Sequence, residues 1–324
     1  MYFHELLRLL GTQPRKHKPR EEGLTMVLDK LGPISEEYLE EALPYVDVVK
    51  IGWTMSSMVS KEYLVKRIRL YREHEVKVTP GGTLMELAYA RGTVDKLLDK
   101  LKELGFDTVE VSNGILNLSR TEKDALIRKA RLKDFTVISE VGKKNPFYRL
   151  SIEDAAKEAL GDLKQGAWKV IVEGREFGRA TCIFDDEGDI IWNRVYSFLK
   201  SLDKKHVVFE APLPHQQIEL IVNLGPNVNL ANIDFKDVLS LETLRLGIRG
   251  DTYVLGKERP LEVSPSARFI YFVLRERGPL TIRELQQLTG LSRRTIHAAL
   301  RELREHYAVK DYGSKGREKL WSVT

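Results

Sequence analysis

Short runs rich in Val and Ile recur along the chain between Gly23 and Arg249, and each is followed by a polar turn and a segment with helical spacing. Near-continuous runs of this kind are typical of strands that are buried on both faces, as in parallel sheets. Eight strand–helix units in one span favour a (β/α)₈ barrel, or TIM barrel, over an open doubly wound sheet. No G-x-G-x-x-G motif follows the first run, which removes the main support for a dinucleotide-binding fold. The eight predicted strands lie within 24–29, 46–52, 76–82, 107–114, 135–142, 168–176, 206–212 and 227–233.

The last fifth of the chain follows a different pattern, with three helical segments and a final hairpin. Residues 266–278 have helical spacing, and Thr281 with Glu284 forms a capping box that begins the next helix. After a tight turn, Ser292 caps a third helix, and residues 308–323 are predicted to form a β-hairpin. This order is that of a small winged helix-turn-helix domain, which resembles DNA-binding domains. The predicted boundaries are 1–255 for the barrel, 256–264 for a linker and 265–324 for the winged-helix domain.

The formal net charge of +5 is concentrated in this C-terminal domain. After residue 260 the chain has 12 Lys and Arg against 7 Asp and Glu, whereas the first 260 residues carry 40 of each sign. Such segregation indicates a local site for a polyanion, and we predict double-stranded DNA. Contacts with another protein or a second copy are the alternative for this domain. The candidate DNA-binding residues are Arg293, Arg294, Thr295, His297 and Arg301 in the third helix, and Lys315, Arg317 and Lys319 in the hairpin.

The remaining composition favours a cytoplasmic protein. Cys182 is the only cysteine, which excludes an intrachain disulfide and suits a reducing compartment. No apolar run approaches the length of about 18–20 residues that is needed to span a bilayer, and the N-terminus lacks the cleavage site of a signal peptide. We therefore expect no membrane partner. We also expect a homo-oligomer.

Charged and polar residues follow nearly every predicted strand, at the carboxyl ends where the active sites of TIM barrels lie. Carboxylates that converge from several strands offer the oxygen ligands that Mg²⁺ prefers, and the chain has no H-x-H or C-x-x-C motif for zinc. The predicted magnesium ligands are Glu140, Glu173 and Glu210, with Asp29 as an outer-shell partner that does not touch the ion. Cations, backbone N–H groups and amides among these acids are suited to an anionic substrate. The candidate substrate-binding residues are Lys30, Lys50, Gly81, Gly82, Arg175, Gln216, Gln217 and Asn229.

A magnesium ion beside a lysine suits one type of reaction. Addition of a nucleophile to an enolate-type substrate builds negative charge on a carboxylate, and Mg²⁺ stabilises that charge. A lysine then protonates the adjacent carbon as a general acid. The candidate catalytic residues lie at the end of the fifth predicted strand: Glu140, Lys143 and Lys144.

Ten motifs follow one another in order between about Gly23 and Thr252: LTMVLDK, VDVVKIGW, KVTPGGTLMELA, LGFDTVEVSNG, ISEVGKK, KVIVEGRE, VFEAP, QQ, NVNLANI and SLETLRLGIRGDT. Together they resemble the phosphosulfolactate synthase family. The resemblance implies a TIM barrel that adds sulfite to phosphoenolpyruvate with the help of Mg²⁺. The product would be (2R)-phospho-3-sulfolactate, the first intermediate of archaeal coenzyme M biosynthesis. In this family the second lysine of the EVGKK motif is the proposed general acid, which implies that role for Lys144.

The chain departs from the family pattern at four places around one predicted pocket. Asn113 stands where the family has the Asp of V-S-D-G, and Phe177 stands where it has the Ser of R-E-S-G. The family motif G-W-G-T-S is Gly52-Trp53-Thr54-Met55-Ser56 here, and Pro214-His215 replaces the K-S that precedes Q-Q. These departures leave three functions open: an active synthase with a DNA-binding module, a ligand-sensing transcriptional regulator with an altered barrel, or a related enzyme that uses a different phosphorylated acid. The retained lysine and glutamates favour the first.

Overall fold

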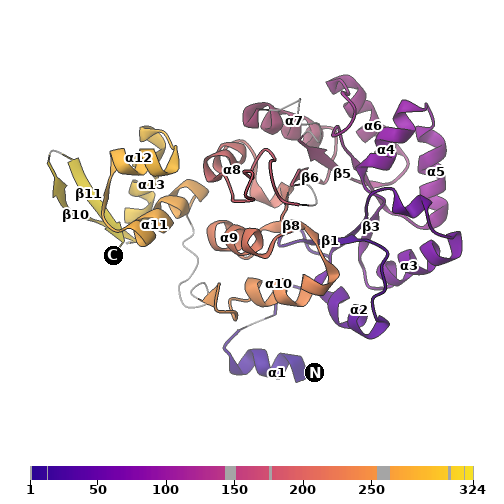
Figure 1. Cartoon of the computed structure of the whole chain (residues 1–324), viewed down its shortest axis with the longest axis horizontal. Helices are drawn as coiled ribbons and strands as arrows, with labels where there is room; N and C mark the ends of the chain where they lie inside the picture. The colour runs from indigo at the N-terminus through magenta and orange to yellow at the C-terminus, as the bar shows by residue number, and fades with distance from the viewer. Residues whose placement is uncertain are drawn as a thin grey trace.

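The computed structural model describes residues 2–12, 14–142, 151–174, 177–253, 263–305, 308–316 and 318–323. Four candidate residues, Lys143, Lys144, Arg175 and Arg317, lie outside these described residues, as does most of the predicted linker. The rest of the chain forms a barrel with a smaller domain on one side of it (Figure 1). Among the described helices, none combines the length and the apolarity that crossing a membrane requires.

Eight parallel strands form the barrel, in the order β3-β2-β1-β8-β7-β6-β5-β4. Neighbours in this order are hydrogen-bonded, and β3 lies against β4, so the sheet nearly closes on itself. The prediction of a (β/α)₈ barrel is confirmed. Each strand falls within one of the eight predicted runs: β1 Thr25–Asp29, β2 Val48–Ile51, β3 Lys77–Thr79, β4 Thr108–Val111, β5 Thr136–Val141, β6 Lys169–Val172, β7 Val207–Glu210 and β8 Asn229–Ile233.

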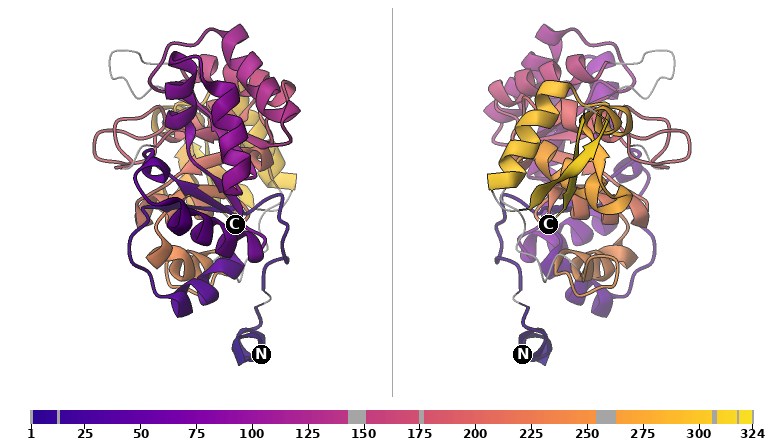
Figure 2. Two further views of the ribbon diagram at one scale, coloured as in Figure 1. Left: turned by 90° about the vertical axis from the view of Figure 1, so that its right-hand side faces the viewer. Right: turned by 90° about the vertical axis from the view of Figure 1, so that its left-hand side faces the viewer.

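Helices surround the sheet, and their apolar stripes pack against its outer face (Figure 1). In α5 (Val94–Leu104), the first residue, Leu98 and Leu101 recur at helical spacing and are buried. Ser119 begins α6 (Arg120–Leu132) with a capping box that it forms with Glu122. The other helices of the barrel are α2 Glu36–Ala42, α3 Lys61–Glu73, α4 Gly82–Ala90, α7 Ile152–Lys164, α8 Trp192–Leu199, α9 Pro214–Leu224 and α10 Val238–Arg245, with short 3₁₀ helices at Leu43–Tyr45, Met55–Ser57, Lys204–His206 and Phe235–Asp237. An N-terminal helix, α1 (Tyr2–Leu9), projects below the barrel in both views of Figure 2.

The interior of the barrel has two layers, and the periodicity of the strands explains both. Side chains two residues apart in a strand point to the same side of the sheet. A lower, apolar layer consists of buried side chains from six strands: Met26, Val48, Ile138, Ile171, Val208 and Ala231. Charged residues stand two positions later on four of these strands, nearer their carboxyl ends: Lys50, Glu140, Glu173 and Glu210. The apolar layer therefore supports a layer of buried charges at the mouth of the barrel.

The C-terminal domain consists of three helices and a three-stranded sheet, which confirms the predicted winged helix-turn-helix fold. Its sheet has the order β10-β11-β9. The Thr281–Glu284 capping box forms as predicted, and the Thr295 backbone N–H donates to the Ser292 hydroxyl at the start of the third helix. The elements are α11 Pro265–Arg277, β9 Leu280–Thr281, α12 Ile282–Thr289, α13 Arg293–Glu305, β10 Val309–Lys315 and β11 Glu318–Val323.

The winged-helix domain packs on the outside of the barrel through α11, next to α8 and α9 (Figure 1). Phe269 of α11 is buried and stacks on Tyr196 of α8, with 4.6 Å between the ring centroids. Trp192, also in α8, lies 6.2 Å from the same phenyl ring. An aromatic cluster of three side chains therefore joins the two domains.

Candidate active site

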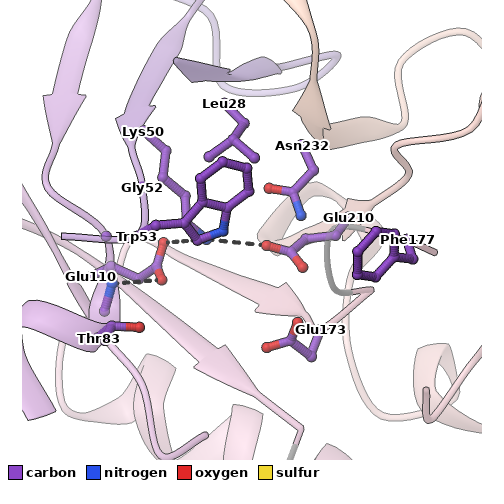
Figure 3. A pocket seen from close by; sticks show the side chains of 12 residues that line it. Leu28, Lys50, Gly52, Trp53, Thr83, Glu110, Glu173, Phe177, Glu210 and Asn232 are labelled. Atoms are coloured by element: carbon purple, nitrogen blue, oxygen red, sulfur yellow. Dashed lines mark hydrogen bonds and ion pairs between the residues drawn. The ribbon is translucent and has the colours of Figure 1, made fainter. Parts of the chain in front are cut away.

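Lys50 lies among glutamates at the carboxyl ends of the strands. Its ammonium nitrogen is 3.0 Å from Glu110 Oε2, 3.1 Å from Glu210 Oε1 and 3.7 Å from Glu140 Oε2. The lysine is only 8% exposed, and the three glutamates are 1% exposed. A pocket of about 350 Å³ is lined by Lys50, Glu110 and Glu210, with Glu173 as a further acid, whereas Glu140 is not among its lining residues (Figure 3). The predicted convergence of charges at the strand ends therefore produces one buried electrostatic cluster.

The charge of Lys50 is stabilised by its neighbours. Burial by itself would lower the pKa of Lys50, because a low-dielectric interior disfavours the ammonium ion. The carboxylates of Glu110, Glu210, Glu140 and Glu173 outweigh burial and hold the pKa of Lys50 well above its ordinary value. The lysine therefore remains a cation at neutral pH, and it is not suited to donating a proton.

Glu110 and Glu210 each connect Lys50 to a neighbouring loop. Glu110 accepts a hydrogen bond from the Gly82 backbone N–H at 2.9 Å through its Oε1, while its Oε2 faces the ammonium. Glu210 accepts from the Gly174 backbone N–H at 2.9 Å through its Oε2, while its Oε1 faces the ammonium. The two acids therefore hold the lysine, the first residue of α4 and the start of the loop after β6.

The two glycines are required because the backbone approaches other groups closely. A Cβ added at Gly82 would lie 2.3 Å from the Ser112 hydroxyl oxygen, and one at Gly174 would lie 2.4 Å from the Glu210 carbonyl oxygen. Neither distance is tolerated without movement of the backbone or a buried side chain. The Gly82 N–H, predicted to bind an anionic substrate, is here directed to a glutamate instead.

Only some of the predicted magnesium ligands have carboxylate oxygens placed to bind the ion. The described residues contain no group of three or more His, Cys, Asp and Glu side chains arranged to hold a metal ion. Glu210 is engaged at both oxygens, by the Lys50 ammonium and the Gly174 N–H. Glu140 and Glu173 come from the adjacent strands β5 and β6, and their carboxylates have the chemistry that Mg²⁺ prefers. These two acids are the predicted ligands that fit the ion.

Several predicted substrate-binding residues do not line the pocket. Asn229 is the first residue of β8, at the opposite end of the barrel, where its amide donates to the carbonyls of Lys205 and Val207 at 3.0 and 2.8 Å. Its assignment to the substrate is therefore corrected. The strand begins rather than ends at this position, and the pocket is lined instead by Asn232.

Gln216, Gln217 and Lys30, which were also predicted to bind substrate, contact other groups of the protein instead. Gln216 is fully buried and donates to the carbonyls of Gly178 and Gly188 at 2.7 and 2.8 Å, which fixes the long loop after β6. Gln217 donates to the Ala211 carbonyl at 3.0 Å. The ammonium of Lys30 lies 5.2 Å from the centre of the Trp53 ring, within range of a cation–π contact.

Glu86 is a site residue that sequence reasoning missed. It lies in α4, is 1% exposed, and accepts hydrogen bonds from the Ser112 hydroxyl and from the backbone N–H groups of Ile115 and Leu116. Its carboxylate therefore shapes the loop that follows β4. The only signal in the sequence is an acid within the otherwise apolar segment TLMELAYA.

Asn113, the departure from the family's V-S-D-G motif, lies in the same loop. Its amide oxygen accepts from the Leu118 backbone N–H at 2.8 Å, and its amide nitrogen donates to the Leu118 carbonyl at 3.1 Å. A carboxylate could not make the second bond, because it has no proton to donate. The asparagine therefore has a structural use in this chain, and it is not among the residues that line the pocket.

The candidate DNA-binding residues of the winged-helix domain fall into two groups. Exposed side chains on α13 include four of them: Arg293, Arg294, His297 and Arg301, while Thr295 is half-buried. On the hairpin, Lys315 pairs with Glu284 at 2.7 Å and Lys319 pairs with Asp311 at 2.6 Å. The opposite face of α13 is buried through Ile296, Leu300 and Leu303.

The (2R)-phospho-3-sulfolactate synthase (ComA) family matches residues 13–251, which is most of the chain, and a winged helix-turn-helix DNA-binding family matches residues 268–306. The chain belongs to the phosphosulfolactate synthase family. A phosphosulfolactate synthase of Methanocaldococcus jannaschii is 43% identical over 237 residues, which cover 72% of this chain and 94% of that relative. The phosphosulfolactate synthase of Bacillus subtilis is 37% identical over 246 residues, which cover 74% of this chain and 96% of that relative. The predicted family is confirmed, and the chain is an enzyme of the lyase class.

A plant protein is a more distant relative of this phosphosulfolactate synthase family member. Protein HEAT-STRESS-ASSOCIATED 32 of Arabidopsis thaliana is 24% identical over 269 residues, which cover 72% of this chain and 89% of that protein. The family match ends at residue 251, before the winged-helix match begins at residue 268. The chain therefore combines a synthase barrel with a separate DNA-binding type of domain.

Proposed function

We propose that the barrel catalyses the Mg²⁺-dependent addition of sulfite to phosphoenolpyruvate, which gives (2R)-phospho-3-sulfolactate. The observation that carries this proposal is the buried Lys50 ammonium in a small pocket lined by glutamates. Family membership supports it, because relatives at 43% and 37% identity are named phosphosulfolactate synthases. The site of Lys50 suits the phosphate or carboxylate of a small anionic substrate.

In the proposed reaction the sulfite sulfur attacks the methylene carbon of phosphoenolpyruvate, so that a carbon–sulfur bond forms and the electron pair of the double bond moves toward the carboxylate. The adjacent carbon then takes a proton. We assign this proton to Lys144, with Lys143 next to it in the sequence, because both follow β5, whose Glu140 carboxylate lies 3.7 Å from the Lys50 ammonium. Lys50 remains charged throughout and stabilises the anionic substrate.

Magnesium would be held by Glu140 and Glu173, whose strands are neighbours. When bound, the ion supplies stabilisation of the negative charge that develops on the substrate carboxylate. Glu210 has a different task in this proposal, since its two oxygens already orient the ammonium of Lys50 and the Gly174 N–H.

The test is phosphorus NMR of the purified protein with phosphoenolpyruvate, sulfite and Mg²⁺. We expect a new phosphate-ester signal that requires all three additions and that disappears in Lys144→Ala. A matched control is Lys133→Ala, which changes a lysine on the outside of the barrel and should leave the signal intact. If phosphoenolpyruvate binds but remains unchanged, the barrel is better described as the ligand sensor of a regulator. A product from another nucleophile would identify a related enzyme.

We also propose that the C-terminal domain binds double-stranded DNA through α13. Arg293, Arg294 and Arg301 are exposed on a helix whose opposite face is buried, as in a recognition helix that enters the major groove. The match to a winged helix-turn-helix DNA-binding family supports the same conclusion. A gel-shift titration with duplex DNA tests it: a shift that is weakened in Arg293→Ala/Arg294→Ala is expected. An unchanged shift in this variant would contradict the assignment of α13.

A further inference from the structure

A second cavity lies where the winged-helix domain meets the barrel, at the contact of α11 with α8 and α9 (Figure 1). It has a volume of about 280 Å³. Its apolar walls come from both domains: Leu199, Leu202 and Leu224 from the barrel, and Val263 and Pro265 from the start of the winged-helix domain. Binding sites for small molecules often lie at such interfaces, and most of them combine an apolar lining with a few polar groups.

Two cations meet in this cavity, one from each domain. Lys204 of the barrel and Arg268 of α11 both belong to its lining. A Cβ added at Gly225 would lie 2.9 Å from Arg268 Nη1 and 3.9 Å from Lys204 Nζ, so the two charged groups approach the same point of the backbone. The Lys204 ammonium also donates a hydrogen bond to the Leu224 carbonyl at 2.9 Å, which fixes its position. The interface between the domains therefore brings an ammonium and a guanidinium together.

The surroundings of these two groups disfavour their positive charges. Burial lowers the pKa of both Lys204 and Arg268, and the field of the guanidinium lowers the pKa of Lys204 further. Glu22 and Asp203 act on Lys204 in the opposite direction, but its pKa stays below the ordinary value. Asp203, which lines the cavity as well, pairs with Lys205 at 3.1 Å. A negative charge added to the cavity would therefore be attracted by both cations.

We propose that this cavity binds a small organic anion whose apolar body packs on the leucines and whose carboxylate or phosphate group binds to Lys204 and Arg268. Charge-assisted hydrogen bonds to an ammonium and a guanidinium would hold the anionic group, and the apolar walls would take the rest of the ligand. The site is distinct from the pocket of Lys50. Lys204 precedes β7, whereas Glu210 ends it, so the two sites lie toward opposite ends of the barrel.

Such a ligand would contact both domains at once. Lys204 comes from the barrel and Arg268 from the winged-helix domain, so the complete site exists only while α11 is docked on the barrel. A ligand that binds only the docked arrangement stabilises that arrangement by mass action. The proposed anion would therefore hold the winged-helix domain against the barrel.

Isothermal titration of the full-length protein tests the proposal with three probes that share a phenyl ring: benzoate, phenyl phosphate and the uncharged benzamide. At least one of the two anions should bind about tenfold or more tightly than benzamide, and the tighter anion shows whether the site prefers a carboxylate or a phosphate. Lys204→Met and Arg268→Gln should each weaken binding of that anion by about tenfold or more, because each removes a charge-assisted hydrogen bond. Lys200→Met is the matched control. It removes an exposed lysine that does not line the cavity, and it should leave binding unchanged.

Three outcomes would overturn the proposal. Neither anion binds, benzamide binds as tightly as the anions, or the anions bind equally well to the wild type and to both cation variants, which would place them at another site such as that of Lys50. Thermal unfolding without ligand separates loss of the site from loss of the fold. Because the two cations repel each other, removal of either should leave the melting temperature close to that of the wild type. If one variant does not fold, the other decides the test alone.

Discussion

The barrel and the winged-helix domain use ion pairs of similar length in different ways. In the barrel, Lys50 lies 3.0 Å from a Glu110 oxygen, and the exposed fractions of the two side chains are 10% and 0%. In the winged-helix hairpin, Lys319 lies 2.6 Å from an Asp311 oxygen, with side-chain exposures of 66% and 42%. The shorter pair is the weaker one, because water and salt screen it. Burial, rather than distance, therefore distinguishes the two regions.

This difference matches what each region is proposed to do. A buried cluster is organised before the substrate arrives, so little reorganisation is needed at the moment of reaction. Exposed cations on α13 and on the hairpin are hydrated and screened, and they can exchange their counterions for phosphates at low cost. Substitutions in the two regions should therefore differ strongly in their effects on stability.

The largest effect is expected for Lys50→Met. Removal of the ammonium leaves Glu110, Glu140 and Glu210 without their common buried counterion, which should cost about 3–5 kcal/mol in the free energy of unfolding. Urea denaturation measures this loss. If unpaired charge is the cause, adding Glu110→Gln to Lys50→Met should restore part of the lost stability. The cause would be contradicted if Lys50→Met cost as much unfolding free energy in Glu110→Gln as it does in the wild type.

The pH dependence of this loss is a second test. Because the pKa of Lys50 is raised on folding, its stabilising contribution is fully present below the unfolded-state pKa of about 10.4 and is lost only as the pH rises through the folded-state pKa. The difference between the wild type and Lys50→Met should therefore remain constant from about pH 7 to pH 9. A difference that shrinks over this range would show that the lysine loses its proton there.

Gly174→Ala should give the next largest effect. The added Cβ would lie 2.4 Å from the Glu210 carbonyl oxygen, so β6 and β7 must separate and the Gly174–Glu210 hydrogen bond must weaken. We expect a loss of about 1–3 kcal/mol in unfolding free energy, together with reduced formation of product. Gly250→Ala is the control, since nothing lies within 4 Å of a Cβ added there. Equal stability of both variants would show that the close approach is not constrained.

Strand periodicity explains why much of the site could be predicted from sequence. Glu140, Glu173 and Glu210 each stand two residues after a buried apolar residue of the inner layer, so their inward direction follows from the pattern alone. The pattern does not say which carboxylates share an ammonium, because that depends on the distances between strands that are not neighbours in sequence. Lys50 comes from β2, whereas its partners come from β4, β5 and β7.

Residues that act through the backbone were the ones that sequence reasoning misjudged. Asn229 was placed at the wrong end of its strand, because a run of polar residues does not fix where a strand begins. Gln216 was expected to touch substrate, but it donates to the carbonyls of Gly178 and Gly188, which lie 38 and 28 positions earlier in the chain. Glu86 was overlooked, since most of its partners are backbone N–H groups, which carry no sequence signature.

Substitutions on α13 should affect DNA binding while leaving the barrel intact. For Arg293→Ala/Arg294→Ala, the slope of log K against log salt concentration should fall in magnitude by about 2, since about 0.9 counterion is released for each phosphate contact. Fluorescence anisotropy with a labelled duplex at several salt concentrations measures the slope. Lys66→Ala/Lys157→Ala removes two exposed lysines from the barrel, and its slope should match that of the wild type. Sulfite addition should be unchanged in both variants.

The smallest effect is expected for the hairpin pair of Lys319 and Asp311. A double-mutant cycle with Lys319→Met and Asp311→Asn should give a coupling within the error of urea denaturation, and high salt should remove any coupling that is seen at low salt. The two variants should change DNA affinity in opposite directions. Lys319→Met removes a cation and should lower the affinity, whereas Asp311→Asn removes the acid that pairs with Lys319 and should raise it. A lower DNA affinity in Lys319→Met and a higher one in Asp311→Asn would show that Lys319 contacts a phosphate of the DNA and that its ion pair with Asp311 competes with this contact. Strong coupling in the stability cycle would instead show that the pair is part of the folded core of the hairpin, and the contrast with Lys50 would fail.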